Sequence, residues 1–542
     1  METSSSCAAA RGRKSRARHP TRGARCAIFA LSALPLLLGA RAAHADPTPP
    51  EAQPEPPDPY ATYRYANGAA DRTFFRAILE GLGVLSVGYV EYLVSTHQSD
   101  RGSHLVYDGS IFHDKLSGNA QSFDANQFGT NFIGHPLGGT LYYTAARSNR
   151  LSVAQSFAWA FTGSLIWEYL GEIGEKPSYN DMIATPWGGF ANGETFTQLS
   201  SFFARGRPTV HNRALQFLFG TPRSVHDWAD GLDPEPAESY DALGFPTDIF
   251  HDFRFAIGAG ATFQTGANGK GTTQYHDHSV ALDLEVRNLP RYGRAGKESR
   301  FFDDGNIAAL RVNVQESEGR LVHGKYEARI TPAGYYVHDA VIDRRGHLRG
   351  ASDILGVSFG YEYGVHDYDR DRRRPIDLLS KVTLVGLLAE HTSYFSGWTV
   401  RTGLAVDADF AGVRSYALPA YLERHTDLDL PFVLRNEGYY YAVGPSVTPR
   451  ITVARAPFEA MASLSLEDFQ GVVGVDVDQS AQTLNITRSD RRLGASGRLA
   501  WRPYGPFEVA ASVDARRREG RMGEAREARS EKSVMGAIGV RF

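Results

Sequence analysis

The residues best suited to chemistry lie between positions 135 and 181. Glu168 and Glu172 are four residues apart, so a helix places both carboxylates on one face, and His135 precedes a proline at an expected helix start. Asp181 follows in an expected turn. Carboxylates that meet a histidine can bind a divalent metal, or form an acid–base pair whose pKa values are separated by like-charge repulsion. We therefore take His135, Glu168, Glu172 and Asp181 as candidate catalytic residues, and Glu168, Glu172 and His135 as candidate metal ligands.

The same residues also have an ordinary structural explanation. Ser178 or Asn180 can cap the helix that follows, and Glu172 can pair with Arg147. The sequence has no HExxH motif, no nucleophile elbow and no ligand set with zinc spacing. These absences favour helix capping over catalysis, and they leave enzyme activity undecided.

One segment, from Asp124 to Glu194, carries uncommon residues in a distinctive order. Its pieces are N-x-x-x-HP-x-x-G-x-x-YY-x-x-AR, then S-x-x-WE-x-x-x-E, then PS-x-ND followed by GG and GE. In these pieces the segment resembles a bacterial family catalogued as domain of unknown function 3943. The resemblance covers residues 124–194 and implies an envelope protein of Gram-negative bacteria. It supplies no activity, cofactor or catalytic residue.

Helices are expected to position these residues, because apolar side chains recur every three or four positions between residues 70 and 245. Ile78 and Leu82 follow this spacing, Leu151 to Leu170 is a long apolar run, and a third helical stretch is predicted from Glu194 to Ala204. The longest run falls short of a membrane span. We therefore predict a helical unit whose helices pack on one another or against the rest of the chain.

The period changes at about residue 246, and from there apolar and polar side chains alternate every two residues. In one such segment Val509, Ala511 and Val513 point to one face of the strand, and Glu508, Ser512 and Asp514 point to the other. About twelve segments of this kind follow one another, as in an outer-membrane barrel. The sequence thus predicts an α+β chain, with a helical unit over 70–245 and a transmembrane antiparallel β-barrel over 246–542.

The ends of the expected strands support this prediction. The last residues alternate up to Phe542, as in a barrel that is closed by its carboxyl-terminal strand. Connections predicted to be short, such as Ala454 to Pro457, alternate with connections predicted to be long, which are Gly412 to Gly438, Asp468 to Arg491 and Arg516 to Glu531. Outer-membrane barrels have short turns on the periplasmic side and longer loops outside.

A soluble sandwich also alternates apolar and polar residues, so the period alone does not say which face points outward. A charged side chain facing lipid costs about 2–4 kcal/mol at the midplane of the bilayer. In a membrane barrel, therefore, side chains such as Glu467, Asp514 and Arg541 are expected to line the lumen. Leu464, Val509 and Ile538 are expected to face lipid.

The amino-terminal residues predict export. Residues 1–45 combine a basic segment, a short apolar stretch and an Ala43-His44-Ala45 cleavage site, which together indicate a signal peptide. Both cysteines, Cys7 and Cys26, fall within it, so the mature chain is expected to have no thiol and no disulfide. Residues 46–69 are rich in proline and are read as a linker.

Charge restricts the choice of partner. Removing the signal peptide takes away eight basic residues and one acidic residue, which leaves a mature net charge of about −10. A mildly acidic chain without a basic block argues against nucleic acid. The expected partners are outer-membrane lipid and, during biogenesis, the barrel-assembly machinery. No cofactor is predicted apart from the divalent metal considered above.

These observations support two classes of function. The first is a structural, binding or transport role in the outer membrane, with a helical unit on the periplasmic side that closes or gates the barrel mouth. The second is an envelope hydrolase or metal-dependent enzyme that acts on lipid or cell-wall material through the cluster of Glu, His and Asp. The sequence names no substrate, and it does not say whether the helices enter the lumen.

Overall fold

The computed structural model describes residues 58, 60–67, 71–98, 109–118, 122–124, 126–172, 175–265, 271–368, 370, 376–425, 434, 437–472 and 486–542. The expected signal peptide and most of residues 46–57 lie outside the described residues. Pro56–Phe542 form one compact unit, so helices and strands share a single body. The predicted domain boundaries at 45/46, 69/70 and 245/246 stay predictions.

Helices occupy the first half of this body. They are α3 (Phe74–Gln98), α4 (Gly109–Ser117), α5 (His135–Ser148), α6 (Val153–Ile166), α7 (Tyr179–Ala204), α8 (Val210–Phe219) and α9 (Thr221–Asp230), with π-helical turns η2 (Thr130–Gly134) before α5 and η3 (Trp167–Gly171) after α6. The side chains of Ser152, Ser178 and Thr209 accept hydrogen bonds from backbone N–H groups and so begin α6, α7 and α8. The helix predicted from Glu194 is therefore the second half of a longer helix, α7.

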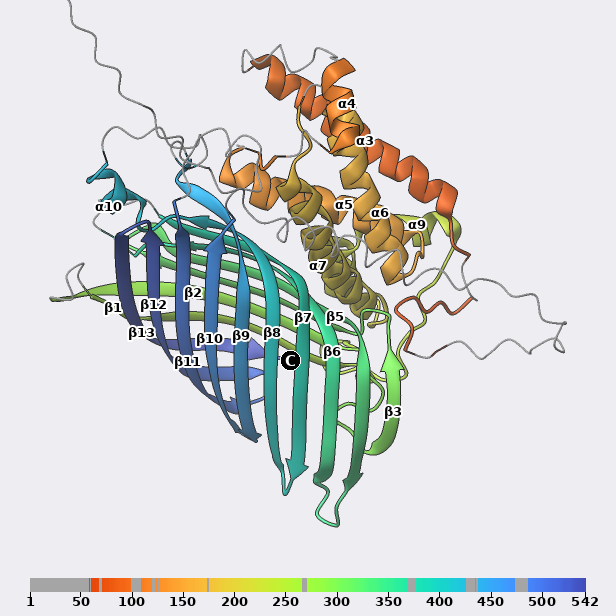
Figure 1. Ribbon diagram of the computed structural model, residues 1–542. Helices are drawn as coiled ribbons and strands as arrows, with labels where there is room; N and C mark the ends of the chain where they lie inside the picture. Colours follow the sequence, from red (N-terminus) through yellow and green to blue (C-terminus); the bar gives the residue numbers. More distant parts are fainter. Residues whose placement is uncertain are drawn as a thin grey trace, which may run out of the picture. The chain divides into compact units, whose positions relative to one another are not determined.

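Strands fill the second half. They are β1 (Phe250–Thr265), β2 (Thr272–Arg287), β3 (Gly296–Phe302), β4 (Ile307–Ser317), β5 (Arg320–Ile342), β6 (Leu348–His366), β7 (Asp377–Phe395), β8 (Trp398–Arg414), β9 (Tyr439–Arg455), β10 (Phe458–Gly471), β11 (Arg488–Tyr504), β12 (Phe507–Met522) and β13 (Ala525–Arg541), with a short helix α10 (Leu418–Leu422) between β8 and β9. All pairings are antiparallel, and the ring closes through β1 with β13 and β5 with β6 (Figure 1).

Two of the strands, β3 and β4, share one place in the ring. The sheet has 13 strands, but β3 and β4 pair with successive parts of the same strand, β5, so twelve strands form the barrel. The chain from β3 to β4 is thus one long strand that is interrupted at residues 303–306. The prediction of an antiparallel barrel of about twelve strands after a helical unit is confirmed.

Charged side chains line the lumen of this barrel. Arg329 on β5 pairs with Asp407 on β8 at 2.6 Å, and Lys381 on β7 pairs with Glu467 on β10 at 2.6 Å. Two strands separate the partners in each case, so the pairs can form only across the interior. Arg541 also lies inside, because it pairs with Glu459 on β10 at 2.7 Å.

Apolar side chains alternate with these residues and face outward. Leu464 is 57% exposed and Ile538 is 51% exposed, and Val509 lies on the outward side of β12 because its neighbour Glu508 pairs with Arg498 inside. The predicted orientation of the strands, with charges inside and apolar residues outside, is therefore confirmed.

Two of the three connections predicted to be long lie between strands: residues 415–438 join β8 to β9, and residues 472–487 join β10 to β11. The third prediction, for Arg516 to Glu531, is wrong. Strands β12 and β13 continue through that segment and meet at a two-residue turn, Gly523-Glu524. The segment is rich in charged residues, which are unusual in a strand. The structure shows instead that some of these charges belong to the lumen wall, where Glu531 contacts His366.

The helical unit lies on the outer wall of the barrel and does not close its mouth (Figure 1). Helix α7 packs on seven outward residues, one from each of seven adjacent strands, which are directly paired from strand to strand: Phe253, Leu284, Leu310, Ala328, Tyr361, Val382 and Phe410. We call these residues the covered row. All seven are buried. The expectation of a helical unit at the barrel mouth is thus wrong. The sequence did not predict the contact, because a period of two does not distinguish an outward residue that meets lipid from one that meets a helix.

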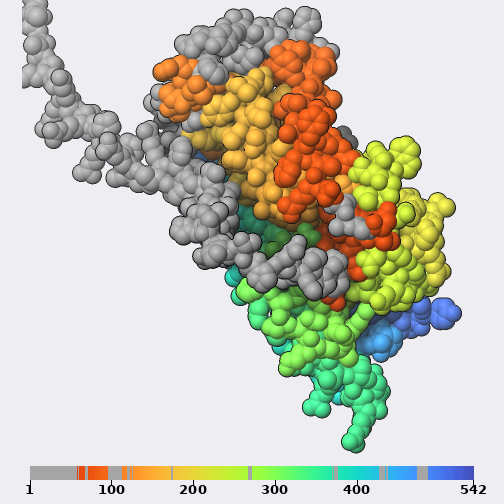
Figure 2. Space-filling model, turned by 90° about the vertical axis from the view of Figure 1, so that its right-hand side faces the viewer, coloured from red at the N-terminus to blue at the C-terminus, as the bar shows by residue number. Residues whose placement is uncertain are grey.

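The remaining helices form further layers on α7. Phe157 on α6 contacts Trp187 and Phe190 on α7, and α5 runs along α7 so closely that Gly139 approaches Gly189. Helix α3 packs on α5 and α6, with Gly81 of α3 against Trp159 of α6. Figure 2 shows α3 and the neighbouring helices at the surface, next to the strands that follow in the sequence. The order from the wall outward is therefore α7, then α5 and α6, then α3.

Candidate functional site

Two of the four predicted site residues meet, together with a third that the sequence analysis did not select. The Nε2 atom of His135, at the start of α5, lies 3.2 Å from Oδ1 of Asp181, in the first turn of α7. Ligand atoms of Asp124, His135 and Asp181 all lie within 4.8 Å of one another. We call these three residues the Asp–His–Asp centre. Asp181 is buried and the other two residues are partly buried.

Helix starts bring the centre together. Ser178 caps α7 by accepting a hydrogen bond from the N–H of Asp181, which confirms the predicted cap. The chain before α5 is fixed to the same place, because Ser122 and Ser178 form a parallel bridge and the N–H of Asp124 donates to Oδ1 of Asn180 at 3.0 Å. Two helix starts and one extended segment thus converge.

Amide and phenol groups hold the carboxylates of the centre. The side-chain amide of Asn180 donates to Asp124 at 3.0 Å and to Asp181 at 2.7 Å. Asn131 and the hydroxyl of Tyr441 on β9 also donate to Oδ1 of Asp124, at 2.6 and 2.9 Å. Tyr441 faces outward from the barrel, so the centre is built partly by the barrel wall. Donors of this kind fix the orientation of groups that bind a cation.

Two π-helical turns, η2 and η3, border this region. Turn η2 ends at Gly134, directly before His135, and η3 carries Glu168. A π-helical turn inserts an extra residue into a helix and is common at functional sites. Two buried oxygens nearby have no hydrogen-bond partner, namely Oδ1 of Asn131 and Oε1 of Glu168.

The other two predicted residues do not join the centre. Glu168 accepts a hydrogen bond from the backbone N–H of Ser178 at 2.6 Å, so one of its oxygens binds the residue that caps α7. Glu172 accepts from the indole N–H of Trp167 at 3.0 Å. Burial, and then the charge of Glu175, raises the pKa of Glu172 to about 8. The predicted set of four therefore divides: His135 and Asp181 share a site, and Glu168 and Glu172 have structural partners.

The electrostatics of the Asp–His–Asp centre favour a positive charge. Two carboxylates close together in a buried setting repel each other, and burial makes each charge costly unless a proton, a cation or hydrogen-bond donors compensate. Asp124 has donors on both oxygens, the second from Asn126 at 2.5 Å. Asp181 meets Asn180 and His135 through the same oxygen, Oδ1. The arrangement can share a proton between Asp181 and His135, or it can bind a divalent cation through carboxylate and imidazole.

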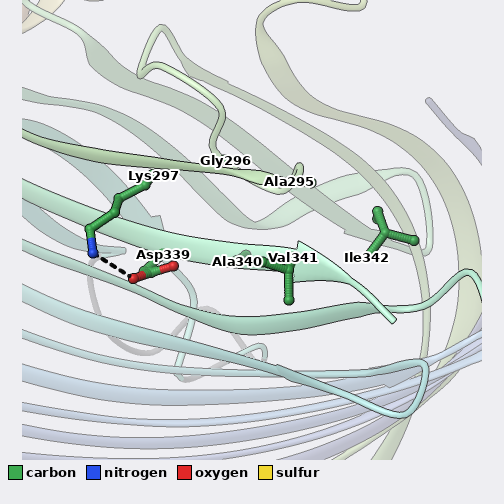
Figure 3. A pocket seen from close by; sticks show the side chains of 7 residues that line it. All are labelled: Ala295, Gly296, Lys297, Asp339, Ala340, Val341 and Ile342. Carbon is green, nitrogen blue, oxygen red and sulfur yellow. Dashed lines mark ion pairs between the residues drawn. The ribbon is translucent and has the colours of Figure 1, made fainter. Parts of the chain in front are cut away.

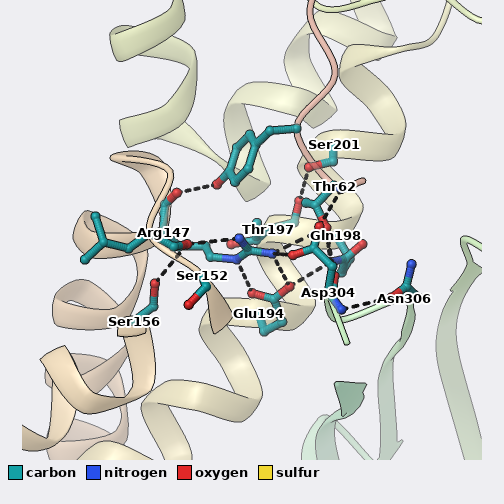
Figure 4. A network of polar contacts seen from close by, with 12 residues as sticks. Thr62, Arg147, Ser152, Ser156, Glu194, Thr197, Gln198, Ser201, Asp304 and Asn306 are labelled. Atoms are coloured by element: carbon teal, nitrogen blue, oxygen red, sulfur yellow. Dashed lines mark hydrogen bonds and ion pairs between the residues drawn. The ribbon is translucent and has the colours of Figure 1, made fainter. Parts of the chain in front are cut away.

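A second polar cluster ties the helices to the barrel (Figure 4). Arg147, near the end of α5, donates to Glu194 of α7 at 2.9 Å and pairs with Asp304 at 2.5 Å. Asp304 lies in the interruption between β3 and β4, and its carboxylate also accepts the N–H of Thr62 at 2.7 Å. The predicted pair of Arg147 with Glu172 is thus wrong. Because every charged member has partners, we read this cluster as structural.

A surface hollow lies elsewhere, beside the edge strand β3 (Figure 3). Backbone and small side chains form most of it, and its charged residues, Lys297 and Asp339, pair with each other at 3.1 Å. It contains none of the predicted site residues. We therefore place the candidate site at the Asp–His–Asp centre.

Sequence reasoning missed Asp124 and Tyr441. Asp124 opens the segment that resembles the family, so its position at the edge of that pattern was an available signal. Tyr441 had no such signal, because it lies more than 300 residues away from Asp124 in the sequence. Only the pairing of β9 with β8 brings its hydroxyl to the helices.

Comparisons with known proteins place a family over these residues. Residues 120–220 match the family described as "Domain of unknown function (DUF3943)", a span that includes the Asp–His–Asp centre, Arg147 and Glu194. No functionally curated protein matches the chain.

Solved structures give distant likenesses. The translocator domain of autotransporter NalP from Neisseria meningitidis is 9% identical, covers 61% of this chain and 98% of its own length, and has a TM-score of 0.21. A Pseudomonas aeruginosa FadL homologue is 8% identical, covers 55% of this chain and 91% of its own length, and has a TM-score of 0.21. The fold assignment therefore rests on the strand pairing of this chain itself. The chain carries a DUF3943 domain over residues 120–220, joined to a closed antiparallel β-barrel.

Proposed function

We propose that the protein is a non-conducting outer-membrane barrel with a structural and binding role, in which the barrel wall supports the DUF3943 helices. The observation that carries this proposal is the set of ion pairs that cross the lumen between strands that are not neighbours. A wide transport channel needs a lumen clear of such contacts, whereas a supporting wall gains rigidity from them.

The crossing pairs occur at several heights of the barrel. Near the end where the chain leaves β13, Arg287 on β2 donates to Glu390 on β7 at 2.8 Å. Near the opposite end, Asp377 on β7 pairs with Arg492 on β11 at 3.0 Å and also contacts Arg518 on β12. The pairs of Arg329 and Lys381 lie between these two levels. Side chains from opposite walls therefore meet along the length of the interior.

Conductance in planar lipid bilayers tests this proposal. The unmodified protein should give no steady channel current, and a variant that combines Arg329→Ala with Lys381→Ala should leak more. A matched control is Arg491→Ala with Asp468→Ala, which removes a pair of the same type that is largely exposed, 2.8 Å apart. A large, steady current through the unmodified protein would overturn the proposal.

We propose further that the Asp–His–Asp centre binds a divalent cation. Three ligand atoms within 4.8 Å of one another support this binding role, as do the amides and the phenol that orient the two carboxylates. A hydrolase role has less support, because the two alcohols that contact Asp181 are both engaged: the hydroxyl of Ser178 in the helix cap and in a 2.6 Å hydrogen bond to Asn180, and that of Ser164 in a 3.2 Å hydrogen bond to the backbone carbonyl of Asp181.

Thermal unfolding in detergent, with zinc or manganese added, tests the cation site. A cation that binds only the folded protein stabilises it by about 2.7 kcal/mol when its concentration is 100 times its Kd. The stabilisation should disappear in His135→Ala and in the nearly isosteric Asp181→Asn. It should persist in His347→Ala, a change at an exposed turn. An equal stabilisation in all four proteins, or none in the unmodified protein, contradicts the cation site.

A further inference from the structure

The outward surfaces of α3, α5 and α6 are apolar. On α3 the exposed large side chains are Phe74, Phe75, Ile78, Leu79, Leu82, Val87, Tyr89, Val90 and Val94. On α5 they are Leu137 and Leu141, and on α6 the outward stripe is Ala154, Ala158, Thr162 and Ile166. Among the exposed side chains described in these three helices, only Glu91 is charged. We call this surface the apolar helix face.

Two charged residues of α3, Arg76 and Glu80, point in the opposite direction. Arg76 faces inward and donates to Asn149 at 2.6 Å, and Glu80 faces inward and contacts His226 at 2.6 Å. The exposed hydroxyl of Ser86 bonds to the backbone carbonyl of Leu82 at 2.7 Å, within its own helix. A helix at a water surface shows the reverse pattern, with charges outward and apolar residues inward. The pattern here is that of a helix whose outer side meets an apolar medium.

The helices also pack through glycine, as membrane helices commonly do. A Cβ atom on Gly139 of α5 would lie 1.8 Å from the carbonyl oxygen of Thr185, and one on Gly189 of α7 would lie 2.2 Å from the carbonyl carbon of Gly139. A Cβ on Gly193 would lie 2.5 Å from the ring of Tyr143. The backbones of α5 and α7 can approach this closely only because these positions lack side chains.

The contacts of α7 show how far the helical unit extends between the two rims of the barrel. Its carboxyl-terminal end packs on Phe253, near the start of β1 and beside Phe542. Its amino-terminal residue Tyr179 packs on Phe123, which stacks on Phe410 and Tyr441 near the opposite rim. With 26 residues, α7 is about 39 Å long at 1.5 Å per residue. The helix therefore extends from one rim of the barrel to the other, along the wall.

Among the described residues, one helix is long and apolar enough to cross a membrane, namely α3 over Phe74–Val94, and only 11% of its most apolar window is buried. We propose that the DUF3943 helices lie in the outer membrane beside the barrel, with the apolar helix face in contact with lipid acyl chains. This inference rests on the proposed membrane location of the barrel, and it replaces the predicted periplasmic placement of the helical unit. Its basis is that a body packed on the outer wall between the two rims occupies the depth of the bilayer.

Spin labels on single cysteines test this inference in lipid vesicles, on a chain that starts at Asp46 and therefore lacks Cys7 and Cys26. The positions are Leu79→Cys on α3, Leu137→Cys on α5, Leu464→Cys on the bare barrel wall and Arg345→Cys in an exposed turn. The first three side chains are 53%, 52% and 57% exposed, so the substitutions leave the packing intact. The readout is the collision rate of each label with oxygen, which concentrates in lipid, and with a water-soluble nickel chelate.

Labels at positions 79, 137 and 464 should all favour oxygen, and the label at 345 should favour nickel. If 464 favours oxygen while 79 and 137 favour nickel, the barrel is in the membrane and the inference about the helices is wrong. If 464 itself favours nickel, the proposed membrane location fails first. Low collision rates with both reagents at 79 and 137 indicate cover by another protein and also overturn the inference.

Discussion

Two sides of the same barrel wall differ in what their outward side chains are. The covered row and its neighbours combine small residues such as Ala328 with tyrosines, and the tyrosine hydroxyls bond to the helical unit: Tyr326 donates to Asn192 at 2.9 Å. The bare wall over β10 to β13 carries aliphatic side chains instead, such as Leu464 and Ile538. Phenol groups need polar partners when they are buried. Outward tyrosines with bonded hydroxyls therefore mark the wall that meets the helices, whereas outward aliphatic residues occur on both walls, as Leu284 of the covered row and Leu464 of the bare wall show.

The largest expected effect comes from separating the covered wall from its helices. Arg147→Ala leaves the buried Glu194 and the partly buried Asp304 without their cation, and breaking a buried pair such as that with Glu194 costs about 3–5 kcal/mol. Arg64→Ala is the control, because it removes a more exposed pair with Glu235, 2.8 Å apart, and such pairs are worth about 0–1 kcal/mol. Unfolding by denaturant in lipid vesicles measures both. Equal losses would remove the role assigned to Arg147.

A matched pair of enlargements compares the two walls directly. Ala328→Leu adds volume at a fully buried position under α7, where overpacking costs about 1–3 kcal/mol. Ala462→Leu adds the same volume on the exposed side of β10 and should leave the free energy of unfolding nearly unchanged. If both variants unfold like the parent, α7 does not rest on Ala328.

A smaller change removes one hydroxyl group from the covered side. Tyr326→Phe leaves the buried side-chain oxygen of Asn192 without its donor, and the expected loss is about 1 kcal/mol. Tyr504→Phe, at a side chain that is 85% exposed, is the control. The difference between the two free energies of unfolding is the measurement. A larger loss in the control contradicts the proposed contact.

A further expected effect is the pH dependence of stability, and it arises in the helical unit, at Glu172. Burial and the charge of Glu175 raise the pKa of Glu172 to about 8, well above its ordinary value of 4.5. The folded protein thus holds this proton more tightly than the unfolded chain does. The resulting stabilisation is complete below pH 4.5 and is lost as the pH rises towards 8. In thermal unfolding, Glu172→Gln should therefore lose less stability than the parent between pH 5 and pH 8, and parallel curves would contradict this.

Much of the fold could be predicted from the sequence, because a period of two fixes the two faces of each strand. The lumen side of Glu467 and Arg541 and the outward side of Leu464 follow from that period. The covered row could not be predicted, because its residues become adjacent only through the register of seven strands. The same limit applies to the site: His135 and Asp181 were found from local helix signals, whereas Tyr441 reaches Asp124 only after the barrel has closed.

The central claim is that α7 lies on the outer wall of the barrel. A photo-reactive benzophenone amino acid in place of Trp187, activated in outer membranes, tests it most directly, because the indole N–H of Trp187 donates to the carbonyl oxygen of Leu384 on β7 at 2.8 Å. Mass spectrometry should find the attachment at outward residues around Leu384 and Val382. Attachment to the lumen residues Lys381 or Asp409, or to turns at the barrel ends, would contradict the account.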